Sequence, residues 1–227
     1  MGTRRNLEEC RLRGEIIATC LDMQDSGINQ GTAGNVSVRW RDGLLITPSG
    51  LPYDQMTEED IVWLNGAGEA VDGQAPSSEW RFHHAIMTTR PEVGAIVHTH
   101  SVHATALAMC RRGIPAAHYM VAVAGGPDIR CADYATFGTE ALSHNALAAL
   151  DGRKACLLAN HGVIATGPTL ERALALAIEI ETLAHQYILS LTLGGPTLLS
   201  AEEMARVQDK FRSYGRRDHP TPPNQEL

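Results

Sequence analysis

The spacing of apolar residues changes repeatedly in the first seventy positions. Over residues 7–26, apolar side chains recur at helical spacing, and Gly27 supplies a stop. The stretch NVSVRWRDGLLI (35–46) then alternates with a period of two around an Asp-Gly pair, which is a strong hairpin signal. DIVWLNGAGEAV (60–71) repeats this pattern around a glycine-rich turn. The pattern predicts one helix followed by two hairpins.

A helix and then an alternation of strands and helices are predicted further along. The stretch SSEWRFHHAIMTTR (77–90) is typical of a helix that is capped by Ser77 or Ser78 and closed before Pro91. Beyond Pro91, short apolar runs alternate with helical patterns. We predict strands over 93–100, 117–126 and 155–162, and helices over 101–110, 136–152 and 169–191.

Caps mark the last two helices. Thr169 precedes the long apolar helix, and Ser200 and Glu203 form a capping box for a final one. The proline-containing tail over 216–227 is expected to be disordered. Because no repeat or linker divides the chain, we predict a single domain over residues 1–227. Its fold class is α/β, with a central, mostly antiparallel β-sheet covered by helices.

Composition narrows the classes of partner. The chain has 227 residues, 44% of them hydrophobic, which allows one sizeable core. The net charge of -7 and the lack of a basic run argue against nucleic acid, although a local site can still bind an anionic small molecule. No stretch reaches the roughly 18 apolar residues of a membrane span. With five scattered cysteines and no apolar leader, we expect a cytoplasmic protein with reduced thiols.

Two histidines follow an apolar run in VHTHSVH (97–103). If that run is a strand, His98 and His100 project from the same face. A third histidine, His161, lies at the end of the other clearly buried strand, predicted over 155–162, and precedes a glycine. Three neutral imidazoles with one open position describe a catalytic zinc site. In the competing interpretation, His161 is a turn residue and His98 is a packed core histidine.

Glu79 stands at the predicted start of the 77–90 helix. Its carboxylate either favours the helix dipole or is held near the metal as a base. Ser77 and Ser78 add hydroxyl groups to the free N–H groups of the helix start, which suits an anion. His83 lies four residues after Glu79, but the spacing does not match H-E-x-x-H. We therefore interpret His83 as a packing or surface residue rather than a ligand.

Two loops combine small residues, hydroxyl groups and open backbone amides. QGTAGNVS contains Thr32, Gly34 and Asn35, and ITPSGLPY contains Ser49 and Gly50. Such loops can form a nest for a phosphate group, and either one can also be an ordinary turn. Neither matches a nucleotide-binding fingerprint.

Together these stretches resemble the class II aldolase and adducin family. The motifs that carry the resemblance run in order from about residue 14 to residue 215: GINQGTAGNVSVR, LLITPSGLPY, PSSEWRFH, VHTHSVH, IPAAHYMVAVAGG, YATFGT, NHGVIA and FRSYG. The resemblance implies a zinc-dependent lyase with one Zn²⁺ per subunit. It also implies a homotetramer with four-fold symmetry and active sites between neighbouring subunits.

The resemblance assigns roles to individual residues. His98, His100 and His161 match the zinc ligands, and Glu79 matches the catalytic carboxylate, which can also ligate the zinc while no substrate is bound. Asn160, beside His161, departs from a relative that carries another histidine there, which bears on substrate tuning rather than on the metal. The residues that match the phosphate-binding loops are Thr32, Gly34, Asn35, Ser49, Gly50, Ser77 and Ser78.

Three aromatic residues complete the implied site. Tyr119 and Phe137 match residues lent by the adjacent subunit, with Tyr119 handling the proton on the aldehyde oxygen. Tyr214 matches a C-terminal tyrosine that closes over the site. The implied reaction cleaves a ketose 1-phosphate, such as L-fuculose 1-phosphate, to dihydroxyacetone phosphate and a small aldehyde such as L-lactaldehyde.

Other activities within the family stay open. A methylthioribulose-phosphate lyase or dehydratase and a 5-deoxyribulose 1-phosphate aldolase would use the same motifs. The 4-epimerases of the family use a carboxylate in the stretch that corresponds to residues 117–123, where this chain has AHYMVAV and no acid. Adducin-like members keep the fold without catalysis, which the presence of all three histidines and Glu79 disfavours.

Overall fold

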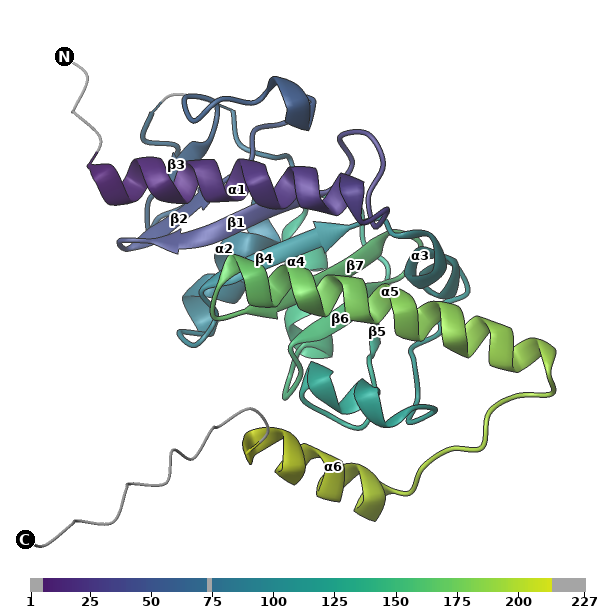
Figure 1. The fold of residues 1–227 in the computed structure, drawn as a ribbon. Helices are drawn as coiled ribbons and strands as arrows, with labels where there is room; N and C mark the ends of the chain where they lie inside the picture. The colour runs from purple at the N-terminus through teal and green to yellow at the C-terminus, as the bar shows by residue number, and fades with distance from the viewer. Residues whose placement is uncertain (1–5, 73–74, 214–227) are drawn as a thin grey trace, which may run out of the picture.

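The computed structural model describes residues 6–72 and 75–213 of the chain (Figure 1). Helices and strands alternate along most of its length. In chain order, the elements are α1 (Leu7–Asp25), β1 (Asn35–Trp40), β2 (Gly43–Ile46), the 3-10 helix η1 (Tyr53–Gln55), β3 (Val62–Leu64), α2 (Trp80–Thr89), β4 (Ala95–Thr99), α3 (Val102–Met109), the 3-10 helix η2 (Tyr119–Ala124), β5 (Cys131–Ala132), α4 (Glu140–Ala149), β6 (Ala155–Leu158), β7 (Gly162–Gly167), α5 (Leu170–Thr192) and α6 (Ala201–Ser213).

Seven strands form one sheet in the order β3-β2-β1-β4-β7-β6-β5. All neighbouring pairs are antiparallel except β5 and β6. Helices cover both faces, as the sequence predicts for this fold class. The register pairs Asn35 of β1 with His98 of β4, and His98 with Ile164 of β7. Residues at the ends of three central strands are therefore brought to the same edge of the sheet.

Side chains alternate between the two faces and build two separate cores. Val36, Val38 and Val97 belong to the core shared with α1, α3 and α5, whereas Ile96 and Ile164 belong to the core shared with α2 and α4. Figure 1 shows α1 and α5 lying across the same side of the sheet. Asn35, Ser37 and His98 alternate with the first set, so they lie on the α2 side.

Several local predictions are confirmed by the structure. Gly27 ends the first helical segment with a φ of 71°. The side chain of Thr169 accepts a hydrogen bond from the N–H of Arg172 at the start of α5. The Ser200 side chain accepts one from the N–H of Glu203 at the start of α6.

Among the described residues, no helix combines the length and apolar character that crossing a lipid bilayer requires.

The predicted strand over 117–126 is wrong, because this segment forms η2 instead. The side chain of His118 accepts a hydrogen bond from the N–H of Met120, and Gly125, with a φ of 94°, ends the helix. The buried side chains of η2 pack into the core with α5. The place beside β6 is taken by β5, which pairs there in parallel.

A second correction concerns the predicted strand over 155–162. The chain turns at Asn160, whose φ is 54°, and returns as β7. His161 therefore lies in a tight turn between two antiparallel strands rather than at the end of one longer strand. The predicted tail over 216–227 lies outside the described residues.

Candidate metal centre and active site

Four side chains that can ligate a metal converge at one edge of the sheet. One ligand atom from each of Glu79, His98, His100 and His161 lies within 4.8 Å of the other three. The planes of the three imidazole rings are inclined to one another by 74–81°, and each pair of ring centroids is 4.9 Å apart. Glu79 comes from the start of α2, the first two histidines from the end of β4, and the third from the β6–β7 turn. The structure thus brings together the metal-binding residues predicted from sequence.

A glycine permits the close approach of these segments. A Cβ atom on Gly162 would lie 2.5 Å from the carbonyl oxygen of Thr99 and 2.8 Å from Cδ2 of His100. Both distances are shorter than real contacts allow. Gly162 therefore lets β7 begin directly against His98 and His100 at the end of β4, which places the neighbouring His161 among the candidate ligands.

The hydrogen-bond pattern of the cluster fits a cation. Nδ1 of His98 lies 2.9 Å from the carbonyl oxygen of Val163 and must donate to it. In neutral His98 this leaves a lone pair on Nε2, which lies 3.1 Å from Oε2 of Glu79 and 3.0 Å from Nε2 of His100. The other carboxylate oxygen, Oε1, is buried 3.0 Å from Nε2 of His161 without a hydrogen bond. Imidazole nitrogens and carboxylate oxygens this close together form a donor set that suits a cation. A backbone carbonyl that fixes the tautomer, as Val163 does for His98, is typical of metal-binding histidines.

The pKa values of Glu79 and His100 are both shifted in the direction that favours metal binding. Burial alone would raise the pKa of Glu79, but the neighbouring His98 and His161 hold it well below its usual range. Burial lowers the pKa of His100 to about 4, and repulsion from His98 in its protonated form adds to the shift. Metal ligands must be deprotonated, so both groups are ready to bind near neutral pH.

Three further polar side chains lie beneath Glu79 and were not recognised as a group from the sequence. Nδ2 of Asn35 donates to Oε2 of Glu79 at 3.0 Å, and Oδ1 of Asn35 lies 2.5 Å from Nε2 of His83. Nδ1 of His83 lies 2.7 Å from Oγ of Ser37. His83 is packed, as predicted, but it also contacts a predicted site residue. The sequence signal was the spacing of Asn35 and Ser37 on one face of β1.

Burial is the main cause that lowers the pKa of His83, to about 3. The imidazole is fully buried, and the charge of His98 lowers the pKa further, while Glu79 partly opposes the shift. We therefore expect His83 to be neutral near neutral pH.

Acidification from pH 7 to pH 5 is expected to lower the free energy of unfolding through His83. Its pKa falls from an ordinary 6.5 to about 3 on folding, so between these values the unfolded chain binds more protons and stability is lost as the pH falls. The expected loss is roughly 2 kcal/mol. Urea titrations of metal-free protein at the two pH values measure it. In His83→Gln this part of the loss should disappear, and an identical loss in both proteins would contradict the prediction.

The predicted phosphate loops meet beside Glu79. The N–H of Ser77 donates to the carbonyl of Thr47, and the N–H of Ser49 donates to the carbonyl of Ala75. The N–H of Thr47 in turn donates to the carbonyl of Val36, next to Asn35. These backbone hydrogen bonds join the start of β1, the loop after β2 and the segment before α2. Of the predicted phosphate-binding residues, the exposed ones are Thr32, Ser49, Gly50 and Ser78, and the buried ones are Gly34, Asn35 and Ser77.

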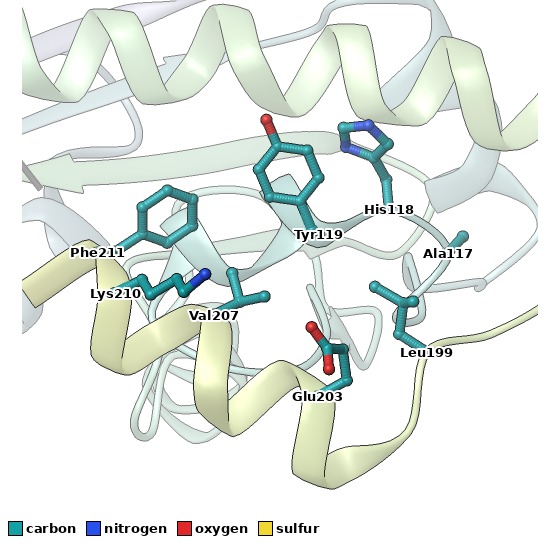
Figure 2. A pocket seen from close by; sticks show the side chains of 8 residues that line it. All are labelled: Ala117, His118, Tyr119, Leu199, Glu203, Val207, Lys210 and Phe211. Carbon is teal, nitrogen blue, oxygen red and sulfur yellow. The ribbon is translucent and has the colours of Figure 1, made fainter.

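Within this subunit, the predicted aromatic residues do not belong to the cluster of Glu79 and the three histidines. Tyr119 is 49% exposed and lines a pocket of about 620 Å³ between η2 and α6, where its ring faces that of Phe211 at 6.3 Å (Figure 2). None of the four metal-cluster residues lines this pocket. Phe137 is 62% exposed between β5 and α4. Both rings are available to a neighbouring molecule. Tyr214 lies outside the described residues.

Helix α3 connects the two sources of histidine ligands. At its first turn, the two carboxylate oxygens of Glu181, on α5, accept the N–H groups of His103 and Ala104. At its last turn, the backbone and side-chain amides of Asn160 donate to carbonyl groups of α3 at 2.9 and 3.3 Å. Because α3 follows His100 and Asn160 precedes His161, this helix is a rigid spacer between the ligands.

Comparisons with known proteins support the fold and the family. The family described as "Class II Aldolase and Adducin N-terminal domain" matches residues 14–188. A solved structure of an L-fuculose 1-phosphate aldolase superposes with a TM-score of 0.87 at 40% sequence identity, covering 93% of this chain and 98% of that one.

Two curated relatives match nearly their whole length. The L-fuculose phosphate aldolase of Escherichia coli strain K12 is 53% identical over 212 residues, covering 93% of this chain and 99% of the relative. The 5-methylthioribulose-1-phosphate/5-deoxyribulose-1-phosphate aldolase of Rhodospirillum rubrum is 55% identical over 213 residues, covering 93% and 96%. The two relatives are named for different substrates but for the same type of carbon–carbon cleavage.

Proposed function

Because this chain belongs to the class II aldolase and adducin family, we propose that it cleaves a ketose 1-phosphate to dihydroxyacetone phosphate and a small aldehyde with the help of a bound Zn²⁺. It is a lyase, in keeping with relatives that are named as aldolases. The observation that carries the proposal is the convergence of Glu79 with three histidines, because one ligand atom of each lies within 4.8 Å of the other three. An adducin-like protein without catalysis would have no need of that cluster.

The chemistry divides among groups of this chain. A divalent cation held by the three histidines would act as a Lewis acid that stabilises negative charge next to the carbonyl group. Glu79 is the carboxylate that removes the C3 proton of dihydroxyacetone phosphate in the synthetic direction and returns it in cleavage. The joined segments around Ser49 and Ser77 offer hydroxyl groups and backbone amides to the phosphate. Tyr119 of a neighbouring subunit handles the proton on the aldehyde oxygen, and Tyr214 closes the site.

L-fuculose 1-phosphate is the first candidate substrate, and its aldehyde product is L-lactaldehyde. The E. coli relative and the solved structure, both named for fuculose phosphate, support it. A second candidate is 5-methylthioribulose or 5-deoxyribulose 1-phosphate, which the identity of 55% to the R. rubrum enzyme favours. All three substrates release the same phosphorylated three-carbon half. The aldehyde half alone distinguishes them.

A panel of ketose 1-phosphates tests the proposal directly. Each substrate is incubated with zinc-loaded protein, and release of dihydroxyacetone phosphate is followed by a coupled reduction. We expect turnover of at least one deoxy-terminated ketose 1-phosphate and a much lower kcat/KM for those that end in a free hydroxymethyl group. Epimerisation at C4 without release of dihydroxyacetone phosphate, or no reaction with any member, would overturn the proposal.

We also propose a homotetramer with active sites between subunits, which predicts complementation between inactive variants. Glu79→Gln and Tyr119→Phe remove groups that would come from different chains, so co-expression should restore partial activity. Glu79→Gln with His161→Ala is the matched control, because one chain supplies both of these groups and no recovery is expected. Light scattering reports the assembly. An active monomer, or equal recovery in both mixtures, would contradict the prediction.

A further inference from the structure

A buried row of side chains leads from the interior of the protein to the carboxylate of Glu79. It consists of Ser37, His83 and Asn35, and Glu79 is its end point. Building on the proposed function, we propose that this row is a positioning device for the catalytic base, in which His83 fixes the direction of the Asn35 amide and the amide fixes Glu79. No role of this kind is implied by the phosphate-loop assignment of Asn35.

The direction of each hydrogen bond follows from the carboxylate. Ionised Glu79 can only accept, so the group of Asn35 at 3.0 Å from Oε2 is the NH₂ group. The carbonyl oxygen of Asn35 then faces Nε2 of His83 at 2.5 Å, so Nε2 must carry the proton. Nδ1 of neutral His83 is left as an acceptor for the hydroxyl group of Ser37 at 2.7 Å. Every donor points toward Glu79.

Solvent cannot substitute for any member of the row. Ser37 and His83 are fully buried, and Asn35 and Glu79 are 4% and 5% exposed. Without the proton on Nε2 of His83, the Asn35 amide could rotate and present its oxygen to the carboxylate, which would be repulsive. Hydrogen bonds in a row of this kind strengthen one another in a low-dielectric interior. The row therefore selects one orientation of the amide.

The secondary structure explains why the row is rigid. Asn35 and Ser37 are two residues apart on β1 and face the same way, and Asn35 pairs with the ligand His98 across the sheet. His83 and Glu79 are one helical turn apart, at the beginning of α2. The ring of Phe82 stacks on His83 at 4.5 Å and meets His98 edge-on at 5.4 Å. Both ends of the row are thus fixed by elements that also carry the metal site.

Glu79 has to release its contacts with the histidine cluster before it can act as a base. Asn35 is not one of the four cluster residues, so its bond to Oε2, the oxygen that also faces Nε2 of His98, can hold the carboxylate while the contacts with the histidines change. Loss of the bond should therefore slow proton transfer without weakening phosphate binding. Removal of a comparable supporting group around a metal site typically costs about 10–100-fold in activity.

Two substitutions of His83 form a matched test. His83→Gln keeps an N–H donor at about the reach of Nε2, so it can still donate to Asn35. His83→Asn keeps a partner at about the reach of Nδ1 for Ser37 but leaves Asn35 without its donor. The measurement is exchange of the C3 proton of dihydroxyacetone phosphate with solvent deuterium, with bound metal and circular dichroism recorded alongside. We expect His83→Asn to lower the exchange rate by about 10–100-fold at an unchanged KM, and His83→Gln to remain within about threefold of wild type.

The outcomes separate this inference from the proposed function. If wild-type protein does not exchange the proton at all, the aldolase proposal fails. If wild type exchanges but the two variants are equally slow or equally fast, the positioning role of His83 is wrong. A KM that rises while kcat holds would assign the row to substrate binding instead and would also overturn the inference.

A spectroscopic measurement tests the row without activity or metal. In ¹⁵N-labelled, metal-free wild type, the His83 ring should show a protonated Nε2 and a bare Nδ1, with the signals assigned by their absence from His83→Gln. The other neutral tautomer, with the proton on Nδ1, would overturn the proposed direction of the row even if His83→Asn failed to fold.

Discussion

Glu79→Gln is expected to slow exchange of the C3 proton of dihydroxyacetone phosphate by about 10²–10⁴-fold, the usual contribution of a general base. A cation can polarise a carbonyl group but cannot accept a proton from carbon. Glu79 is the carboxylate in the described cluster, so its basicity should limit this half-reaction. Deuterium exchange measured without any aldehyde isolates the base from the aldehyde pocket.

The glutamine variant is well matched to the structure. Its side-chain oxygen can still accept the bond from Nδ2 of Asn35, which is 3.0 Å from Oε2 in wild type. We therefore expect near-wild-type folding and metal content that is retained or modestly reduced. Exchange at the wild-type rate would mean that another base acts. His83 is poorly placed for that role because its Nε2 faces Asn35.

His98→Ala, His100→Ala and His161→Ala should each lower bound metal and turnover together. Lewis-acid stabilisation of several kcal/mol corresponds to a loss of about 10³-fold or more in rate. Metal is measured by elemental analysis after gel filtration, and turnover by release of dihydroxyacetone phosphate. Chelator-stripped wild type should lose activity in the same proportion and regain it when Zn²⁺ is restored.

His144→Ala is the control for removing a histidine from this protein. His144 is exposed on α4, where alanine is a good helix former. It should retain full metal content and activity. Full activity in a metal-free sample of wild type, or loss of activity in His161→Ala with normal metal content, would contradict the role of the cluster.

Elements with their own local signals could be predicted from the sequence, whereas those decided by their neighbours could not. The hairpin between β1 and β2 forms where the sequence predicts it, although Arg41, with a φ of 51°, and Asp42 make the turn and Gly43 already pairs with Trp40. Residues such as Gly27 and Thr169 mark helix ends through their own backbone and side chains. The run over 117–126 is apolar without a distinguishing period, so a buried 3-10 helix and a buried strand look alike there. β5 has only two residues and depends on β6 as its partner.

The candidate site divides in the same way. His98 and His100 could be related because their separation of two residues in a strand sets a common face. Alternation in β1 likewise puts Asn35 and Ser37 on one face, but nothing in the local sequence says that α2 covers that face. His83 meets them only through tertiary packing, across separations of 48 and 46 residues. Contacts of that range carry no local sequence pattern.

The helix α3 spacer has a consequence for how the protein matures. The pairing of β4 with β7 encloses α3, η2, β5, α4 and β6, so His100 and His161 meet only after this long segment has folded. Closing a loop of that length is slow, because the chain loses conformational entropy before the contacts between β4 and β7 can stabilise it. We therefore expect that the proposed Zn²⁺ does not nucleate the fold, in contrast to small zinc-dependent domains, and that the apoprotein folds first and acquires its metal afterwards. In a cell short of zinc, we expect a folded, inactive pool that can be switched on by supplying the ion, without new synthesis.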